Sequence, residues 1–251
     1  VQVYKGLDIG SAKVTEEEKE GIPHHLLDFK EVTEEYTIYH YQKDCREKIK
    51  DIQSRNKTPI LVGGTGLYIK AALYDYKLSE EKSTNTYDNL TNEELYEELK
   101  KLDKDIIIDK DNRRRLIRAI NYYKENNESI NKNKTNKLLY NVIFIGLTTD
   151  RQVLYDKINK RVDEMISQGL LEEVKSFYDK GIKSKPLLNA IGYRELYNYL
   201  DGNCTKEEAI EKIKQNSRHY AKRQYTFFNH QLPVVWFETD YNNFNNTIEK
   251  V

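Results

Sequence analysis

A threonine set among glycines is the first arrangement in the sequence that could do chemistry. Thr65 lies between Gly64 and Gly66, after an apolar run at residues 60–62 and before a run of helical composition at 67–73. Glycine lets the backbone turn sharply and approach a ligand closely, and ligands of open α/β sheets bind outside the carboxyl ends of strands. The threonine hydroxyl could therefore donate to a phosphate or a base. The alternative is a tight strand-to-helix turn with a capping threonine.

Arginine is concentrated in a predicted helix over residues 110–125. Four arginines fall within six residues, and they are Arg113, Arg114, Arg115 and Arg118. The second and the last are four residues apart, so they share one face of the helix. Arginine pairs bidentately with phosphate, which favours a nucleic-acid backbone as the ligand. A charge run on a merely solvated face is the alternative.

A second basic group belongs to a long predicted helix over residues 206–228. Residues 212–223 hold no acidic residue but contain Lys212, Lys214, Arg218, Lys222 and Arg223. Aromatic residues are interleaved with them or follow directly, namely Tyr220, Tyr225, Phe227 and Phe228. Basic and aromatic side chains together suit a surface that holds phosphates and stacks bases.

Arg194 could also meet an anion. It follows Gly192 in the first turns of a predicted helix over residues 189–200. The positive end of that helix and the guanidinium could bind an anion together. A surface ion pair with the adjacent Glu195 is the alternative.

Residues 2–13 predict a strand end that runs into a loop. Gly6 and Gly10 are its turn residues, and we expect Ser11 and Lys13 to be exposed. Such a loop could contact phosphate.

No pattern of metal ligands or disulfides is present. His24 and His25 are adjacent, and neighbouring side chains on a strand point to opposite faces, so the two do not easily converge on one ion. Cys45 and Cys204 are far apart and have neither a Cys-x-x-Cys nor a histidine spacing. These features fit a reducing compartment.

The composition is that of a polar globular protein of balanced charge. The 251 residues include 38% hydrophobic and 33% charged residues, with a mean hydropathy of −0.84. Lys+Arg equals Asp+Glu at 41 each, so any affinity for nucleic acid must come from local clusters. No apolar run approaches the roughly 20 residues that span a bilayer. We expect no signal peptide and a cytoplasmic location.

The elements that would position these residues alternate between helices and short apolar strands. Buried strands are predicted over residues 60–62 and 142–147, and a last, short strand over residues 234–237. Further helices are predicted over residues 39–55, 67–73, 154–168 and 171–180. This alternation predicts an α/β fold with a parallel sheet.

The middle of the chain differs from the rest. Polar tracts at residues 79–89 and 126–137 enclose two predicted helices, at 92–102 and 110–125. Such boundaries predict a helical insertion into an α/β domain. We therefore predict a core made of residues 1–78 and 138–251 and an insertion made of residues 79–137.

Seven stretches along nearly the whole chain carry a family resemblance. They are QVYKGLDIGSAK, PHHLLD, PILVGGTGLY, RRRLIRAI, IGLTTDR, AIGYREL and RHYAKRQYTFF. In this order, and with an arginine-bearing helical insertion among them, they resemble the bacterial tRNA dimethylallyltransferases, also called tRNA isopentenyltransferases.

The resemblance implies a P-loop NTPase-like core that binds dimethylallyl diphosphate with Mg²⁺, and a helical insertion that binds the anticodon stem-loop of tRNA. The dimethylallyl group would pass to N6 of the adenine 3′-adjacent to the anticodon. The base must then leave its stack and enter the crevice. Because N6 of adenine is a poor nucleophile, a general base near it and cations at the departing diphosphate are expected aids.

The resemblance, together with the basic clusters, also implies roles for single residues. Thr65 and Arg194 would be catalytic, and Lys13 and Arg194 would bind the diphosphate. The tRNA-binding residues would be Gln2, Thr65, Arg114, Arg115, Arg118, Arg218, Lys222 and Arg223. Gln2 and Thr65 are expected on opposite walls of the crevice that receives the flipped adenine.

Two features depart from the family pattern. The family has a glycine-rich phosphate loop ending in Lys-Ser/Thr, and then an aspartate general base just before the stretch that begins here at Val1. We therefore expect the phosphate loop, the magnesium-binding hydroxyl and the base to lie upstream of Val1, and a polypeptide starting at Val1 to be inactive. In addition, the insertion is short, and residues 109–112 lack the His-Pro-Asn-Asp pattern of the family.

Three other functions stay open at this stage. An adenylate isopentenyltransferase would modify a free nucleotide, although the basic insertion argues against it. A P-loop kinase of nucleotides or small metabolites would share the core but has no need of the basic patch at residues 212–223. A non-catalytic RNA-binding protein would follow if the upstream residues were absent. We expect a monomer that does not bind membranes.

Overall fold

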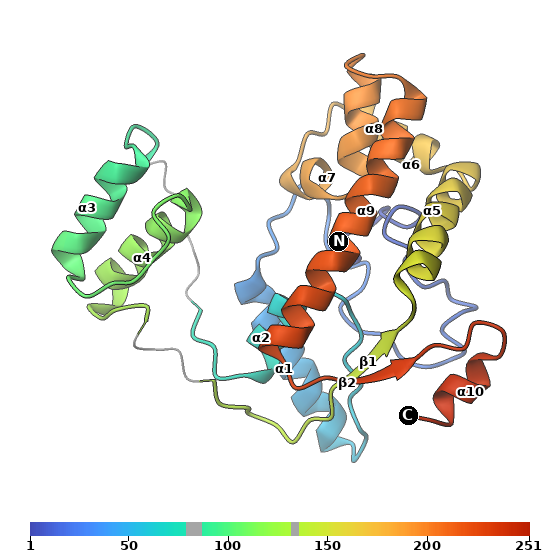
Figure 1. Ribbon diagram of the computed structural model, residues 1–251, viewed down its shortest axis with the longest axis horizontal. Coiled ribbons are helices and arrows are strands. Elements are labelled where there is room, and N and C mark those ends of the chain that lie inside the picture. Colours follow the sequence, from blue (N-terminus) through green and yellow to red (C-terminus); the bar gives the residue numbers. More distant parts are fainter. Residues whose placement is uncertain (79–86, 132–135) are drawn as a thin grey trace.

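The chain folds into helices around a small parallel sheet, with one pair of helices set to the side (Figure 1). This structure is a computed structural model, and it describes residues 1–78, 87–131 and 136–251. Across these residues, no helix is long and apolar enough to cross a membrane.

The sheet of the described residues has two parallel strands. β1 is Ile145–Thr148 and β2 is Val235–Glu238, with Ile145 opposite Val235. The strands predicted at 142–147 and 234–237 are confirmed in place, but each begins later than predicted. The expectation that the former is buried on both faces is wrong, because Ile145 and Leu147 remain 49% and 47% exposed.

The strand predicted at residues 60–62 is wrong. These residues are extended without strand pairing, and Ile60 and Val62 are 84% and 87% exposed. Leu61, between them, packs into the cluster around α1 and α2. The apolar run therefore buries one face only, because no described strand pairs with it.

Two helices flank this extended segment. α1 is Ile38–Ser54 and α2 is Gly66–Leu73, close to the predicted helices. Arg46 of α1 donates from Nε to the Ala72 carbonyl oxygen at 3.0 Å and from Nη2 to the Tyr74 carbonyl oxygen at 2.6 Å. A side chain of α1 thus satisfies carbonyls that the end of α2 leaves without helical partners.

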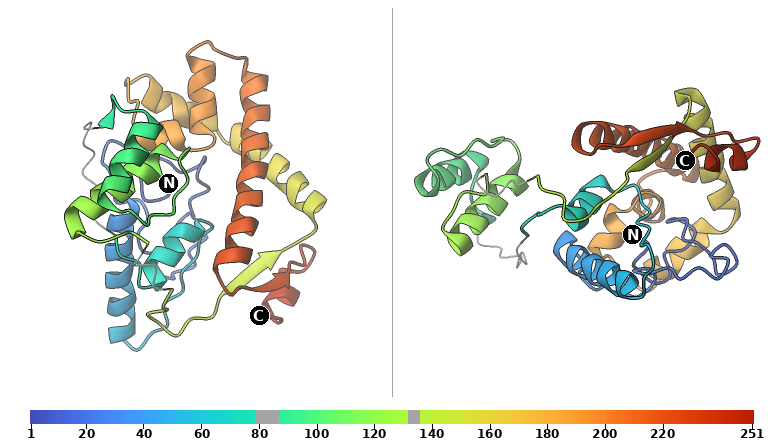
Figure 2. Two further views of the ribbon diagram at one scale, coloured as in Figure 1. Left: turned by 60° about the vertical axis from the view of Figure 1, so that its left-hand side comes forward. Right: turned by 90° about the horizontal axis from the view of Figure 1, so that it is seen from below.

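A helical layer forms the rest of the main body. Its elements are α5 Arg151–Ser167, α6 Leu170–Tyr178, α7 Lys185–Asn189, α8 Tyr193–Leu200, α9 Lys206–Gln231 and α10 Phe244–Ile248. The helix predicted over 189–200 is confirmed as α8 but begins later, at Tyr193, because Gly192 with φ +97° separates it from α7. α9 runs the length of the body against α2, α5 and α8 (Figures 1 and 2).

The helix pair at the side consists of α3 Asn92–Leu102 and α4 Arg113–Asn126. Both helices carry N-terminal caps, since Thr91 and Asn112 accept from Glu94 N–H and Arg115 N–H. The pair has its own apolar cluster, centred on Leu95, Leu99, Leu116 and Ile120. Parts of the polar tracts predicted beside it, at residues 79–86 and 132–135, lie outside the described residues.

Candidate functional site

The glycine turn packs against α9. A Cβ added at Gly64 would overlap the side chain of Gln224, and one added at Gly66 would overlap the ring of Phe227. Gln224 Nε2 also donates to the Gly64 carbonyl oxygen at 3.0 Å. These glycines are therefore needed for the close approach of a basic helix to the turn.

Thr65 is the N-cap residue of α2, but its side chain makes no capping hydrogen bond. The side chain is exposed, and its Oγ1 lies 3.2 Å from the hydroxyl oxygen of Tyr220 on α9. The interpretation of Thr65 as a capping residue is therefore wrong. Its hydroxyl is at the surface, beside an aromatic residue of the basic helix.

Gln2 and Lys13 belong to one folded loop at the start of the chain. Gln2 Nε2 donates to the carbonyl oxygens of Ser11 and Ala12, each at 3.0 Å. Lys13 Nζ donates to the Tyr4 carbonyl oxygen and to carboxylates of two aspartates. Only 8% of the Lys13 side chain is exposed, so the expectation of an exposed lysine is wrong.

This loop and the glycine turn are neighbours in the structure. Tyr4, two residues beyond Gln2, is buried, and burial followed by the proximity of Tyr68 raises its pKa. Tyr68 itself lies in α2, three residues beyond Thr65. The structure thus brings the elements that carry Gln2 and Thr65 to the same region of the main body.

Glu173 is a residue of this region that sequence reasoning missed. Its carboxylate accepts from the backbone N–H groups of Asp8, Ile9 and Gly10 and from the hydroxyl of Tyr193. A glutamate in the first turn of α6 looks like an ordinary response to the helix dipole. No spacing in the sequence indicates a partner more than 160 residues away.

Arg194 and Glu195 begin α8 as an ion pair. Arg194 donates to Glu195 Oε1 from Nε at 3.2 Å and from Nη2 at 2.6 Å. Glu195 is 3% exposed and also accepts from Asn216 of α9, at 2.7 Å, and from the Gly192 N–H. The arginine side chain is 47% exposed, so the guanidinium is held in place with one side toward solvent.

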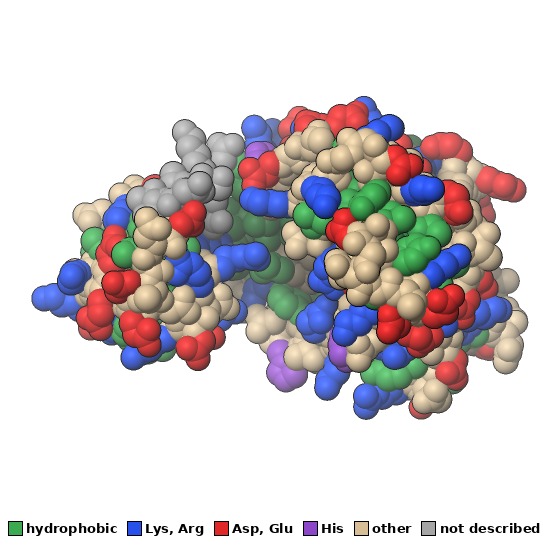
Figure 3. All heavy atoms as spheres, turned by 90° about the horizontal axis from the view of Figure 1, so that it is seen from above, with side chains coloured by type: hydrophobic (Ala, Val, Ile, Leu, Met, Phe, Trp, Pro, Cys, Tyr) green, Lys and Arg blue, Asp and Glu red, His purple; other side chains and the backbone are tan. Residues whose placement is uncertain are grey.

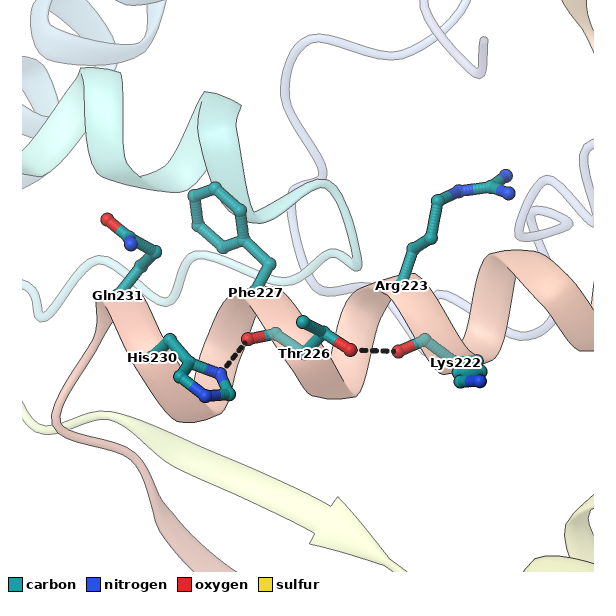
Figure 4. Close-up of a pocket in the computed structure, with 6 residues that line it drawn as sticks. All are labelled: Lys222, Arg223, Thr226, Phe227, His230 and Gln231. Atoms are coloured by element: carbon teal, nitrogen blue, oxygen red, sulfur yellow. Dashed lines mark hydrogen bonds between the residues drawn. The ribbon is translucent and has the colours of Figure 1, made fainter.

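Lys222 and Arg223, two of the basic residues of α9, line a groove beside α2 (Figure 4). Its volume is about 380 Å³, and its lining residues are Lys222, Arg223, Thr226, Phe227, His230 and Gln231. Arg223 also lies over the ring of Tyr220, 5.8 Å from its centroid. Arg218 is instead directed to α5, where its Nη1 donates to Asn159 Oδ1 at 2.5 Å. The groove thus combines cations with an aromatic face.

One arginine of α4 makes hydrogen bonds within the helix pair, and two others are exposed at its surface. Arg113 donates to the carbonyl oxygens of Leu90 and Tyr87, at 2.6 and 2.5 Å, and so holds the chain that precedes α3. Arg114 and Arg115 are exposed. A second groove, of about 330 Å³, is lined by Arg113, Arg114, Ile117, Arg118 and Asn121. Figure 3 shows Lys and Arg side chains on the side of the helix pair that faces the main body.

Within residues 1–78, 87–131 and 136–251, no three His, Cys, Asp or Glu side chains gather as ligands for a metal ion. His24 and His25 are both exposed, and His24 Nδ1 lies 2.9 Å from the Ile22 carbonyl oxygen, so their interpretation as structural histidines stays a prediction.

Comparisons with known proteins find close relatives. A family model described as "IPP transferase" matches residues 2–231. The tRNA dimethylallyltransferase of Anoxybacillus flavithermus is 50% identical over 95% of this chain and 79% of its own length. That of Geobacillus thermodenitrificans is 46% identical over 100% of this chain and 84% of its own length.

Solved structures agree with these matches. A tRNA isopentenylpyrophosphate transferase from Staphylococcus epidermidis is 38% identical, with a TM-score of 0.73 over 99% of this chain and 85% of that one. A eukaryotic dimethylallyltransferase acting on tRNA is 27% identical, with a TM-score of 0.86 over 99% of this chain and 68% of that one. The P-loop NTPase-like α/β class that the sequence predicts is confirmed by this likeness.

Proposed function

This chain belongs to the IPP transferase family, and on that premise we propose that it is a tRNA-modifying prenyltransferase. It transfers a dimethylallyl group from dimethylallyl diphosphate to N6 of the adenine 3′-adjacent to the anticodon. The observation that carries the proposal is the packing of the Thr65 turn on α9, since it joins a surface hydroxyl to a helix that bears cations and aromatic rings. Base and backbone contacts of an RNA loop need that combination.

The reaction exchanges one bond for another. The N6 lone pair attacks C1 of the dimethylallyl group, the bond from C1 to the ester oxygen of the α-phosphate breaks so that diphosphate leaves, and N6 loses a proton to a general base. The lone pair is delocalised into the ring, so a cation that stabilises the leaving diphosphate has a large effect. Arg194 suits that role, because Glu195 orients its guanidinium before the diphosphate binds.

We assign RNA contacts to the two grooves. The exposed arginines of α4 would bind phosphates of the anticodon stem-loop, and Lys222 and Arg223 would bind phosphates near the flipped base. In this proposal, residues 79–137 form the RNA-binding insertion and residues 1–78 with 138–251 form the catalytic core. Gln2 and Thr65 would contact the adenine, and Lys13 would act on the diphosphate side of the same crevice.

Lys13 is already hydrogen-bonded within the first loop of the chain. Its ammonium already has three acceptors, so a direct contact with diphosphate requires that one of them be exchanged. We propose that Mg²⁺ accompanies the diphosphate, where it would supply positive charge beside the leaving group. In the described part of the chain, no three His, Cys, Asp or Glu side chains gather as ligands for such an ion. We further propose that the protein acts in the cytoplasm as a monomer.

A single-turnover assay tests the function. The complete protein is mixed with radiolabelled dimethylallyl diphosphate and an anticodon stem-loop, and we expect label in the RNA at the adenine next to the anticodon. A stem-loop with guanine at that position is the matched control and should remain unlabelled. Transfer to AMP at an equal rate would instead indicate the adenylate isopentenyltransferase, and phosphorylation of a small molecule would indicate a kinase.

A further inference from the structure

One carboxylate holds a whole turn of the loop at the start of the chain. Glu173 Oε2 accepts from the N–H groups of Asp8 and Ile9, at 3.0 and 2.8 Å, and Oε1 accepts from Gly10 N–H at 3.2 Å. Consecutive N–H groups that converge in this way form a concave anion-binding turn. Here the anion is a side chain of α6, and bonds to an ionised acceptor are stronger than neutral ones.

The Glu173 carboxylate is fixed by Tyr193 and by the packing of α6. The Tyr193 hydroxyl donates to Glu173 Oε1, and Tyr193 is fully buried at the start of α8. Leu170 and Val174, on the same helix as Glu173, are buried in the same apolar cluster as Leu7. Glu173 therefore has little freedom to leave the loop.

The end of the same loop, at Ser11 and Ala12, is hydrogen-bonded to Gln2. Both N–H bonds of the Gln2 amide end on carbonyl oxygens of the loop, those of Ser11 and Ala12. Two carbonyl acceptors fix which end of the amide is the nitrogen. Only the Oε1 end is then left for a ligand, and it is a pure acceptor. The exocyclic N6 of adenine is a donor, whereas guanine presents a carbonyl oxygen at the same place.

We propose that Glu173 is a positioning residue for the transfer reaction, and that it acts through the loop at residues 8–12 by fixing the direction in which Gln2 presents Oε1. This inference rests on the proposed function, in which Gln2 contacts the target adenine. Glu173 does not contact the base in this scheme, because its carboxylate is taken up by the loop and Tyr193, and so it contributes nothing to affinity. It affects how well N6 is oriented for attack, and misorientation of a reacting group costs about 10-fold to 100-fold in rate.

A carboxylate is required at this position. Glu173→Gln keeps the size of the side chain, but it replaces one acceptor oxygen with an NH₂ group that faces backbone N–H donors. The loop must then move away from α6 or leave donors unsatisfied. Tyr193→Phe removes a single donor and leaves the three backbone bonds intact, so its effect should be much smaller.

A double-mutant cycle tests the inference in the complete protein. Single-turnover transfer, stem-loop Kd and dimethylallyl diphosphate Kd are measured for the parent, Glu173→Gln, Gln2→Ala and the double variant. We expect Glu173→Gln to lower the transfer rate about 10-fold or more with both Kd values within about twofold of the parent. In the Gln2→Ala background the same substitution should change the rate less than about twofold, since coupled residues are not additive.

Controls separate this result from simple loss of structure. Glu172→Gln, an exposed neighbour on α6, should leave rate and affinity unchanged, and hydrogen exchange at residues 8–10 should quicken only in the Glu173 variant. If Glu173→Gln does not fold, Glu173→Asp retains the charge with a shorter reach and should show the same loss confined to the rate. The inference would be overturned if Glu173→Gln lowered the transfer rate equally in the parent and in the Gln2→Ala variant. It would also be overturned if Glu173→Gln weakened binding of the stem-loop or of dimethylallyl diphosphate. No transfer by the parent would instead overturn the proposed function.

Discussion

At the scale of single residues, the site consists of polar groups whose partners are already in place. Arg194 has its guanidinium on a buried glutamate, and Gln2 has both amide hydrogens on backbone carbonyls. Side chains held in this way lose little freedom when a ligand binds. Groups fixed before the substrate arrives are the ones that can stabilise charge as it develops.

Arg194→Ala should weaken binding of dimethylallyl diphosphate and leave tRNA affinity nearly unchanged. One lost hydrogen bond to a charged group corresponds to about 1.5–3 kcal/mol, which is roughly a 10-fold to 100-fold rise in Kd. Isothermal titration with the diphosphate measures it, and Lys185→Ala, which removes an exposed charge nearby in sequence, is the control. Unaltered diphosphate affinity would remove Arg194 from the site.

Thr65→Val should slow transfer without weakening stem-loop binding. The two side chains are nearly isosteric, so the change isolates the hydroxyl, which makes no capping bond that α2 would lose. We expect about a fivefold lower single-turnover rate, the equivalent of one hydrogen bond of about 1 kcal/mol. Thr65→Ser retains the hydroxyl and should transfer near the parent rate. If Thr65→Val also transfers near the parent rate, the Thr65 hydroxyl has no part in the reaction and the glycine turn is purely structural.

At the scale of elements, most helices were predictable but the strands only in part, since those at 142–147 and 234–237 formed and the one at 60–62 did not. Helices are local features that apolar periodicity reveals, and those predicted over 92–102 and 110–125 lie within a few residues of their predicted bounds. Strands depend on partners, so the apolar run at 60–62 is extended but unpaired. Its composition alone does not say whether a neighbour exists.

The site shows the same division between local and distant information. The glycine turn and the basic faces of α4 and α9 follow from short stretches of sequence and could be predicted. Glu173 could not, because its partners at residues 8–10 become neighbours only through the packing of α6 on the first loop. Lys13 was expected to be exposed for a related reason, since Asp28 meets it only after folding.

Arg114→Ala combined with Arg118→Ala should lower tRNA affinity and flatten its dependence on salt. Each phosphate contact that is lost removes about one unit from the slope of log affinity against log salt. The control is Lys101→Ala combined with Lys104→Ala, which removes the same amount of charge from exposed positions in or beside α3 of the same helix pair. Filter binding over a series of salt concentrations gives both slopes. A slope equal to the parent's would show that this face of α4 is only solvated.

Arg46→Ala should destabilise the junction where α2 ends and the chain leaves for the helix pair. The guanidinium donates to the carbonyl oxygens of Ala71, Ala72 and Tyr74, and buried acceptors without donors cost about 1–3 kcal/mol in the free energy of unfolding. Lys43→Ala, an exposed change on the same helix, is the control. Chemical denaturation measures the difference, and equal stability of the two variants would contradict the role of Arg46.

At the scale of the whole molecule, three extended segments bury one face and expose the other. Leu61, Val142, Phe144 and Val234 all pack into the cluster around α1 and α2. Their neighbours Ile60, Val62, Ile143, Ile145 and Val235 lie at the surface. The alternation is that of strands with one covered side. It leaves a row of β-branched residues in water over the described part of the chain.

Replacing members of that row by lysine should therefore cost little stability. Val62 and Ile143 are 87% and 82% exposed, so Val62→Lys with Ile143→Lys should change the free energy of unfolding of this chain by no more than about 0.5 kcal/mol. The same change should reduce binding of a hydrophobic dye, because an exposed apolar patch is lost. Leu61→Ala, one position along, is the matched control and should cost about 2 kcal/mol or more, because it truncates a side chain that packs into the core. Denaturation and dye fluorescence are measured together. If the lysine variant unfolds as readily as the Leu61 variant, both faces of these segments are buried in solution, and the row is an internal surface of the protein.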